Sequence, residues 1–275
     1  MTTNEIVNQI KKKQSFLCVG LDIDLEKIPL HLKSHPDPIF AFAKAMIDAT
    51  EQYSVAFKPN LAFFESYGVA GWIAFEKIMN YLNDNYPNHF TIADAKRGDI
   101  GNTASRYAKA FFETYAVDSV TVAPYMGQDA VEPFLKFKDK HAILLALTSN
   151  SGASDFQYTQ EENQRLFETV YTPSVSWKNS ARVMYVGGAT KSESLSKIRK
   201  IVPDSFLLVP GVGAQGGSLA EIVQAGMNGS CGLLVNSSRG ILYQSQGTDF
   251  EKAAANEAQK LQKEMAFYLN NKGII

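Results

Sequence analysis

The segment DAKRGDIGNTA at 94–104 brings together charged residues that could perform acid–base or electrostatic catalysis. Side chains two residues apart in an extended strand point to the same face, so we expect Asp94 and Lys96 to project side by side. A helix that begins after position 98 would place Asp99 and Thr103 one turn apart. A structural ion pair is the alternative, but further charged residues at the ends of other apolar segments favour a catalytic role.

A glycine-rich segment, PGVGAQGG at 210–217, could approach a phosphate group closely. Its glycines match GxGxxG, which in isolation suggests a dinucleotide site. However, the segment follows the seventh apolar run of the chain rather than the first, and no acidic residue for a ribose ends the next run. After that run, Arg239 offers a bidentate cation beside the backbone N–H of Gly240. This favours a site for a single phosphate group. A glycine-rich turn without a ligand is the alternative.

The elements that must position these groups are short apolar runs separated by segments of helical periodicity. There are eight runs: FLCVGLD (16–22), SVAFKP (54–59), FTIADAK (90–96), DSVTVAP (118–124), AILLALT (142–148), RVMYVGG (182–188), FLLVPG (206–211) and GLLVNSS (232–238). Continuously apolar strands that alternate with helices predict a parallel sheet covered on both faces. Eight such units predict a (β/α)8 TIM barrel, and an open, doubly wound sheet is the structural alternative.

In such a barrel, the catalytic groups lie at the carboxyl ends of the strands. Polar residues gather at these positions: Asp22, Lys58, Asn60, Asp94, Lys96, Thr148, Ser149, Gln215 and Arg239. Any one of them could be an ordinary boundary residue that faces solvent. Their convergence at one end of the predicted barrel favours a shared site.

Helical segments complete the prediction of one domain over residues 1–275. The segment TNEIVNQIKKK predicts a leading N-terminal helix that could cover the lower mouth of the barrel. From Asp249 onward, DFEKAAANEAQKLQKEMAFYLNN predicts a final helix for the outer ring. The longest irregular stretch, SNSGASDFQYTQEENQ (149–164) with the later YTPSVSWKNS (171–180), follows the fifth run, where it could partly cover the site.

The composition excludes several classes of partner. A formal net charge of −1 gives no broad basic field for nucleic acid, so we expect a small-molecule substrate. The N-terminus is polar, and no run reaches the roughly 18 apolar residues that span a bilayer, so no membrane partner is expected.

The cysteines indicate the cellular setting, and the histidines bear on whether the protein binds a metal ion. Cys18 and Cys231 lie in apolar segments, which predicts reduced, buried thiols and a cytoplasmic setting. His31 and His35 have a spacing that could bind metal on a helix, but no Glu or Cys accompanies them, so no metal site is expected.

The motif at 94–104 resembles the signature of orotidine 5'-monophosphate decarboxylases. LCVGLDIDLEKIP, FKPNLAFFE, LTSN and VPGVGAQGG resemble corresponding segments of the longer-chain bacterial branch of that family, in order from the first strand to the eighth. The resemblance implies conversion of orotidylate to UMP and CO2 in de novo pyrimidine biosynthesis, without a cofactor. It also implies a homodimer with shared active sites.

The resemblance carries roles to individual positions of this sequence. It implies that Lys58, Asp94, Lys96 and Asp99 form an alternating charge array, and that Asp22 and Lys58 bind the ribose hydroxyls. Asn60, which follows the second strand, is a further candidate for substrate binding. The resemblance further implies that Asp99 and Thr103 reach into the partner's site, that Thr148 or Ser149 contacts the pyrimidine, and that Gln215, Arg239 and Gly240 bind the phosphate. Decarboxylation at C6 leaves an electron pair that the ring cannot delocalise, so a cation is needed, and Lys96 is expected to stabilise and protonate that carbon.

Two other functions are compatible with parts of this pattern. Sugar-phosphate decarboxylases or aldolases of the same superfamily share Asp-x-Lys-x-x-Asp but use Mg²⁺, and they would be expected to have an acidic group where Lys58 stands. A noncatalytic phosphate-binding barrel would not require Asp94, Lys96 and Asp99 together.

Overall fold

The computed structural model describes residues 1–161, 163–188, 192–211 and 218–275. Eight parallel strands form a closed barrel in the order β1-β10-β9-β8-β5-β4-β3-β2. Their bounds are β1 (Leu17–Leu21), β2 (Ala56–Pro59), β3 (Phe90–Arg97), β4 (Ser119–Val122), β5 (His141–Leu144), β8 (Val183–Val186), β9 (Leu207–Pro210) and β10 (Leu233–Ser237). The predicted barrel is confirmed, and the open-sheet alternative is wrong because the first strand pairs with the last.

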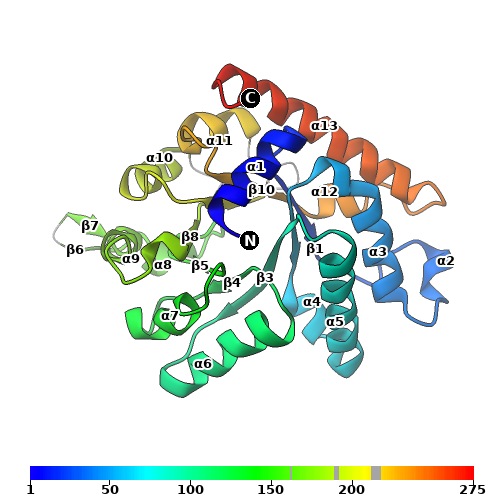
Figure 1. Ribbon diagram of the computed structural model, residues 1–275, viewed down its shortest axis with the longest axis horizontal. Helices are drawn as coiled ribbons and strands as arrows, with labels where there is room; N and C mark the ends of the chain where they lie inside the picture. The colour runs from blue at the N-terminus through cyan, green and yellow to red at the C-terminus, as the bar shows by residue number, and fades with distance from the viewer. Residues whose placement is uncertain (162, 189–191, 212–217) are drawn as a thin grey trace. The chain divides into compact units, whose positions relative to one another are not determined.

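The helices alternate with the strands along the chain, as the colours of Figure 1 show. They are α1 (Thr3–Lys13), α2 (Leu30–Lys33), α3 (Pro38–Thr50), α4 (Leu61–Glu65), α5 (Gly68–Asn85), α6 (Gly101–Lys109), α7 (Gln128–Leu135), α8 (Ala153–Phe156), α9 (Leu166–Ser174), α10 (Ser192–Ile201), α11 (Leu219–Gly226), α12 (Arg239–Leu242) and α13 (Phe250–Asn271). A small antiparallel pair, β6 (Gln160–Glu161) and β7 (Gln164–Arg165), lies in the stretch that was expected to be irregular.

The chain divides into two compact units. The first unit contains residues 1–95, 115–117 and 236–275, and the second contains 96–114 and 118–235. In the first unit, α3 and α13 lie side by side (Figure 1). The expectation of a single domain over residues 1–275 stays a prediction.

The leading helix α1 belongs to the first unit and begins with a reciprocal cap. The Thr2 hydroxyl accepts from the Glu5 N–H, while the Glu5 carboxylate accepts from the Thr2 N–H. Ile6 and Ile10 are fully buried. At the end of the helix, Lys13 donates to the Glu51 carbonyl, and its Nζ lies 2.7 Å from His89 Nε2. Since Glu51 and His89 precede β2 and β3, α1 is fastened at the amino ends of these strands.

His89 makes the stability of the first unit depend on pH. Burial, together with the charge of Lys13, lowers the pKa of His89 from an ordinary 6.5 to about 4. Below about pH 6.5 the unfolded chain binds a proton at His89, whereas the folded chain binds that proton only below about pH 4. Stability is therefore complete above pH 6.5 and decreases as the pH falls toward 4.

We expect the wild type to lose on the order of 2 kcal/mol of unfolding free energy through His89 between pH 7 and pH 5. Urea unfolding at both pH values should show this loss in the wild type and a smaller one in His89→Gln. The exposed His35 provides the matched control, because His35→Gln should follow the wild type. A His89→Gln protein with wild-type pH dependence would contradict this assignment.

In the second unit, a half-buried arginine joins α10 to the segments before β9 and β10. The Arg199 guanidinium donates to the carbonyls of Val202, Pro203, Ser205, Gly226 and Gly232. Burial lowers the pKa of Arg199 to about 10, so the side chain remains protonated at neutral pH. It satisfies carbonyl groups of several chain segments at once, which holds the end of α10 to the segments that precede β9 and β10.

Candidate active site

The first unit contains a buried cluster of one lysine and two carboxylates at the ends of β1, β2 and β3. Lys58 in β2 is 4% exposed, and its Nζ lies 2.9 Å from Asp94 Oδ2 and 4.0 Å from Asp22 Oδ1. The parallel register pairs Gly20 with Lys58, and a bridge pairs Asn60 with Asp94. The structure therefore brings together the residues of this unit that the sequence placed at the ends of the first three strands.

The charges of this cluster determine the protonation state of its lysine. Burial on its own would lower the pKa of Lys58, but the negative charges of Asp94 and Asp22 outweigh burial and raise that pKa above its ordinary value. Lys58 is therefore a fixed cation rather than a base. Cys18 lies in β1 near these charges, and burial raises the pKa of its thiol to about 12. Both cysteines are free and buried, as predicted.

Asp22 keeps one oxygen that is suited to a ligand hydroxyl. Within the described residues, the buried Oδ1 of Asp22 has no hydrogen-bond partner, although Lys58 Nζ lies 4.0 Å away. The backbone around Asp22 is held by Tyr243, whose hydroxyl donates to the Asp22 carbonyl and accepts from the Asp24 N–H. The carboxylate thus stands on a fixed loop with an unused acceptor.

Close packing between β1 and the end of β10 was not predicted. A Cβ at Gly20 would lie 1.8 Å from Ser238 Oγ and 3.0 Å from Asn236 Oδ1. Asn236 Nδ2 donates to Ser238 Oγ, whereas its buried Oδ1 has no hydrogen-bond partner in the part of the chain that the structure describes. The sequence signal for this contact is weak, because a glycine in a barrel strand does not indicate which side chain it accommodates.

Arg239 and Gly240 begin α12, one residue after the end of β10. The Arg239 side chain is exposed, and Gly240 is half-buried. The Gly240 carbonyl accepts a hydrogen bond from Gln244. The arginine is therefore available to an anion at the end of the eighth barrel strand, where the sequence predicted it.

Lys96 belongs to the second unit, and its backbone departs from the strand geometry that the sequence suggested. Its φ is +49°, in the left-handed region that non-glycine residues seldom adopt, and its side chain is exposed. The expectation that Asp94 and Lys96 share a face assumed regular strand alternation. The positive φ of Lys96 interrupts that alternation within β3, and the placement of the two side chains side by side stays a prediction. The Lys96 N–H donates to the Thr121 hydroxyl at 2.9 Å instead.

Asp99 and Thr103 lie differently from the predicted helix start. The helix α6 begins at Gly101, not directly after Gly98, because Ile100 is extended and Gly101 has a φ of +53°. Asp99 precedes the helix, and its Oδ1 accepts from the Ile100 N–H at 2.8 Å. Thr103 is exposed in the first turn of α6. The expected spacing of one helical turn between them is therefore wrong.

Thr148 and Ser149 follow β5 in the second unit and differ in their contacts. The Thr148 N–H donates to Gln157 Oε1 at 2.7 Å, and Gln157 Nε2 donates to the Thr148 hydroxyl at 2.8 Å. The same hydroxyl donates to Asn150 Oδ1. Ser149 is half-buried. Gln215 and most of the glycine-rich segment lie outside the described residues.

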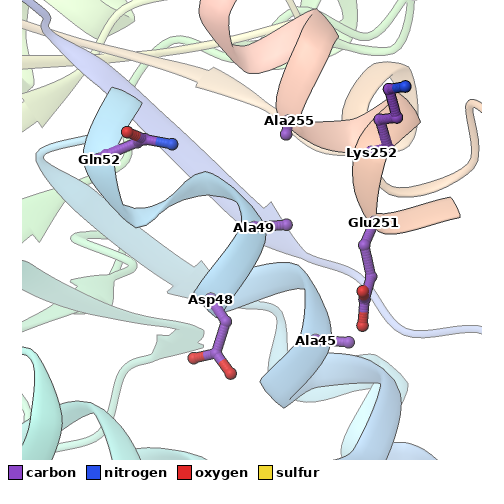
Figure 2. Close-up of a pocket in the computed structure, with 7 residues that line it drawn as sticks. All are labelled: Ala45, Asp48, Ala49, Gln52, Glu251, Lys252 and Ala255. Carbon is purple, nitrogen blue, oxygen red and sulfur yellow. The ribbon is translucent and has the colours of Figure 1, made fainter. Parts of the chain in front are cut away.

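A surface pocket elsewhere in the first unit contains none of these residues. Figure 2 shows it between α3 and α13, lined by Ala45, Asp48, Ala49, Gln52, Glu251, Lys252 and Ala255. In the described ranges, no group of three or more His, Cys, Asp or Glu residues could hold a metal ion. None of the described helices has the length and apolar character needed to cross a membrane.

Comparison with known proteins identifies the family. A family model described as orotidine 5'-phosphate decarboxylase / HUMPS family matches residues 15–255. The chain belongs to the orotidine 5'-phosphate decarboxylase family. The decarboxylase of Flavobacterium johnsoniae is 61% identical over 272 residues, which cover 99% of this chain and 100% of the relative. The decarboxylase of Bacteroides fragilis is 59% identical, with 97% of each chain covered.

Solved structures of orotidine 5'-phosphate decarboxylases have the same fold. The OMP decarboxylase of Leishmania donovani superposes with a TM-score of 0.82 at 32% identity, covering 97% of this chain and 100% of that one. The resemblance of the motif at 94–104 to this family is thus confirmed over nearly the whole chain. The predicted enzyme class, a carboxy-lyase, is confirmed with it.

Proposed function

We propose that this chain converts orotidine 5'-monophosphate to UMP and CO2 as a step of pyrimidine biosynthesis, with Lys96 as the proton donor and without a metal or organic cofactor. The observation that carries the proposal is the buried Lys58, held between Asp94 and Asp22 at the ends of the first three strands. Together with Lys96 and Asp99 of the same motif, these residues would provide the alternating charges that the family signature implies. The two free thiols suit a cytoplasmic setting.

In the proposed reaction, the bond from C6 to the carboxylate breaks and its electron pair stays on C6. Carbon dioxide leaves, and the Lys96 ammonium transfers a proton to C6. Until that transfer, the positive charge of Lys96 stabilises the electron pair, which lies in the plane of the ring. Asp94 faces the departing carboxylate, and Lys58 and Asp99 hold the array in place. The neutral Lys96 amine then takes a proton from solvent.

The remaining residues bind the parts of the substrate that do not react. Asp22 and Lys58 bind the ribose hydroxyls, with the unused Asp22 Oδ1 accepting one of them, and Asn60 is a further substrate contact. Thr103 reaches with Asp99 into the site of the partner. Thr148 and Ser149 contact the pyrimidine. We assign the hydroxyl group that contacts the pyrimidine directly to Ser149, because the Thr148 hydroxyl already makes hydrogen bonds with Gln157 and Asn150. Gln215, Arg239 and Gly240 bind the phosphate, whose binding energy holds the ring in its reactive position.

Lys58 distinguishes this proposal from an Mg²⁺-dependent sugar-phosphate enzyme. A metal ion that stabilises an enediolate needs acidic ligands, whereas Lys58 puts a permanent positive charge in the cluster. The deciding experiment incubates EDTA-treated protein with orotidine 5'-monophosphate and follows UMP formation. Turnover that persists in EDTA supports the proposal. Absence of turnover, or turnover only after Mg²⁺ is restored, would overturn it.

We further propose that the chain acts as a homodimer whose two sites are shared. In the second unit, exposed apolar side chains follow β3 and β4: Ile100 is 56% exposed, Tyr125 is 96% exposed and Met126 is 48% exposed. Large apolar side chains at this exposure favour contact with another protein surface. Asp99 stands beside Ile100, so a second copy seated on this surface could receive Asp99 in its own site.

The shared-site proposal predicts that Lys96→Ala and Asp99→Ala rescue each other. Each homodimer should be inactive, whereas in the hybrid one site has both defects and the other has neither. Fully hybrid dimers should therefore regain about half of wild-type activity, and random exchange of equal amounts should give about a quarter. The measurement is UMP formation after subunit exchange, with hybrids verified by differently tagged subunits. Verified hybrids that remain inactive, made from folded and dimeric parents, would contradict sharing.

A further inference from the structure

The backbone of Lys96 is held in an unusual conformation by a side chain from the next barrel strand. Lys96 has a φ of +49°, and its N–H donates to Thr121 Oγ1 at 2.9 Å. Thr121 lies in β4 and is 1% exposed. The buried Thr121 hydroxyl accepts from this N–H in place of a backbone carbonyl, near the end of β3.

Two further contacts fix the same segment against the end of β4. The Ala123 N–H donates to the Arg97 carbonyl at 2.8 Å. A Cβ at Gly98 would lie only 2.9 Å from the Ala123 carbonyl oxygen, so glycine permits the close approach there. The segment 96–98 at the end of β3 is therefore held against β4 at three successive residues, and Thr121 makes the contact that belongs to Lys96 itself.

We propose that Thr121 is a positioning residue for the Lys96 ammonium. The proposal rests on the assignment of Lys96 as the proton donor. The direction of a side chain is set by φ and ψ at its Cα, so the hydrogen bond that holds this segment also sets where the ammonium begins its reach. Without the Thr121 hydroxyl, the part-buried Lys96 N–H loses that acceptor, the backbone at Lys96 can relax, and the ammonium leaves its reactive position.

Thr121→Val tests this role, because valine keeps the branched shape and removes only the hydroxyl group. We expect kcat to fall by about tenfold to a hundredfold, since small misplacements of a catalytic group have effects of that size. KM and the affinity for UMP should stay near wild type, because Thr121 is proposed to position the reacting group and not to bind substrate. Thr121→Ser restores the hydroxyl and should recover most of the lost kcat.

A second readout reports on Lys96 without decarboxylation. By microscopic reversibility, the group that protonates C6 also removes that proton, so the enzyme should exchange the C6 hydrogen of UMP for deuterium in D2O. Thr121→Val should slow this exchange by a factor similar to its effect on kcat. Ser119→Ala is the matched control, since it removes another buried hydroxyl from β4 and should leave both rates unchanged.

The outcomes separate this inference from the proposed function. If the wild type forms no UMP, the proposed function fails at the first step. If the wild type is active and a folded Thr121→Val protein matches it in kcat and exchange, the positioning role is overturned. Equal losses in Thr121→Val and Thr121→Ser also overturn it. Should valine prevent folding, Thr121→Ala and Thr121→Ser make the same comparison, and if no hydroxyl-free variant folds, Thr121 is structural and the inference is wrong.

Discussion

Lys96→Ala is expected to lower kcat by more than about four orders of magnitude, because it removes a general acid and an electrostatic stabiliser at once. The loss should appear in kcat and only weakly in the affinity for UMP, since Lys96 is proposed to act on the developing charge at C6. Steady-state assays with orotidine 5'-monophosphate and calorimetric titration with UMP measure the two quantities. Because Lys96 is an exposed residue, its truncation creates no cavity in the core, and the variant should fold normally.

Lys252→Ala provides the control for a change in charge. Lys252 is an exposed lysine of α13 at the surface pocket shown in Figure 2, which none of the proposed site residues lines, so its removal should leave kcat unchanged. Circular dichroism should show the same helix content in both variants. Product formation by Lys96→Ala at a rate close to wild type would eliminate Lys96 as the proton donor.

Arg239→Ala is expected to lower kcat/KM by roughly two orders of magnitude, because the variant loses a charge-assisted, bidentate contact with the phosphate. The guanidinium is exposed at the end of β10, so its removal leaves no buried group unpaired. The loss should shrink sharply with orotidine, which lacks the phosphate, because the missing contact then has no partner in the wild type either. An equal loss with both substrates would show that Arg239 acts on something other than the phosphate.

The sequence predicted the barrel well, because each strand is a short apolar run and each boundary carries polar residues that are visible locally. It also predicted the cluster of Lys58 with Asp94 and Asp22, since residues at the carboxyl ends of neighbouring parallel strands must approach one another. These features depend on periodicity and on the general geometry of the fold.

The errors concern single residues whose conformation depends on distant parts of the chain. Strand alternation could not show that Lys96 adopts a positive φ, because Thr121 accepts its N–H from a strand 25 residues away. The sequence predicted a helix start directly after Gly98, whereas α6 begins at Gly101 because Ile100 is extended and Gly101 has a positive φ. The contacts of Arg199 were missed for a similar reason, since its carbonyl partners belong to loops that no sequence pattern assigns to it.

The attachment of Asp22 to Tyr243 has a consequence for the order in which the protein can fold during synthesis. The Tyr243 hydroxyl binds the backbone of Asp22 and Asp24 across separations of 221 and 219 residues. Ribosomes add about 5–20 residues per second, so Tyr243 is made about ten seconds or more after Asp22. Before Tyr243 is made, a growing chain can pair its early strands, but the backbone at Asp22 and Asp24 lacks these two hydrogen bonds. The loop that carries Asp22 is therefore fixed only after Tyr243 has left the ribosome.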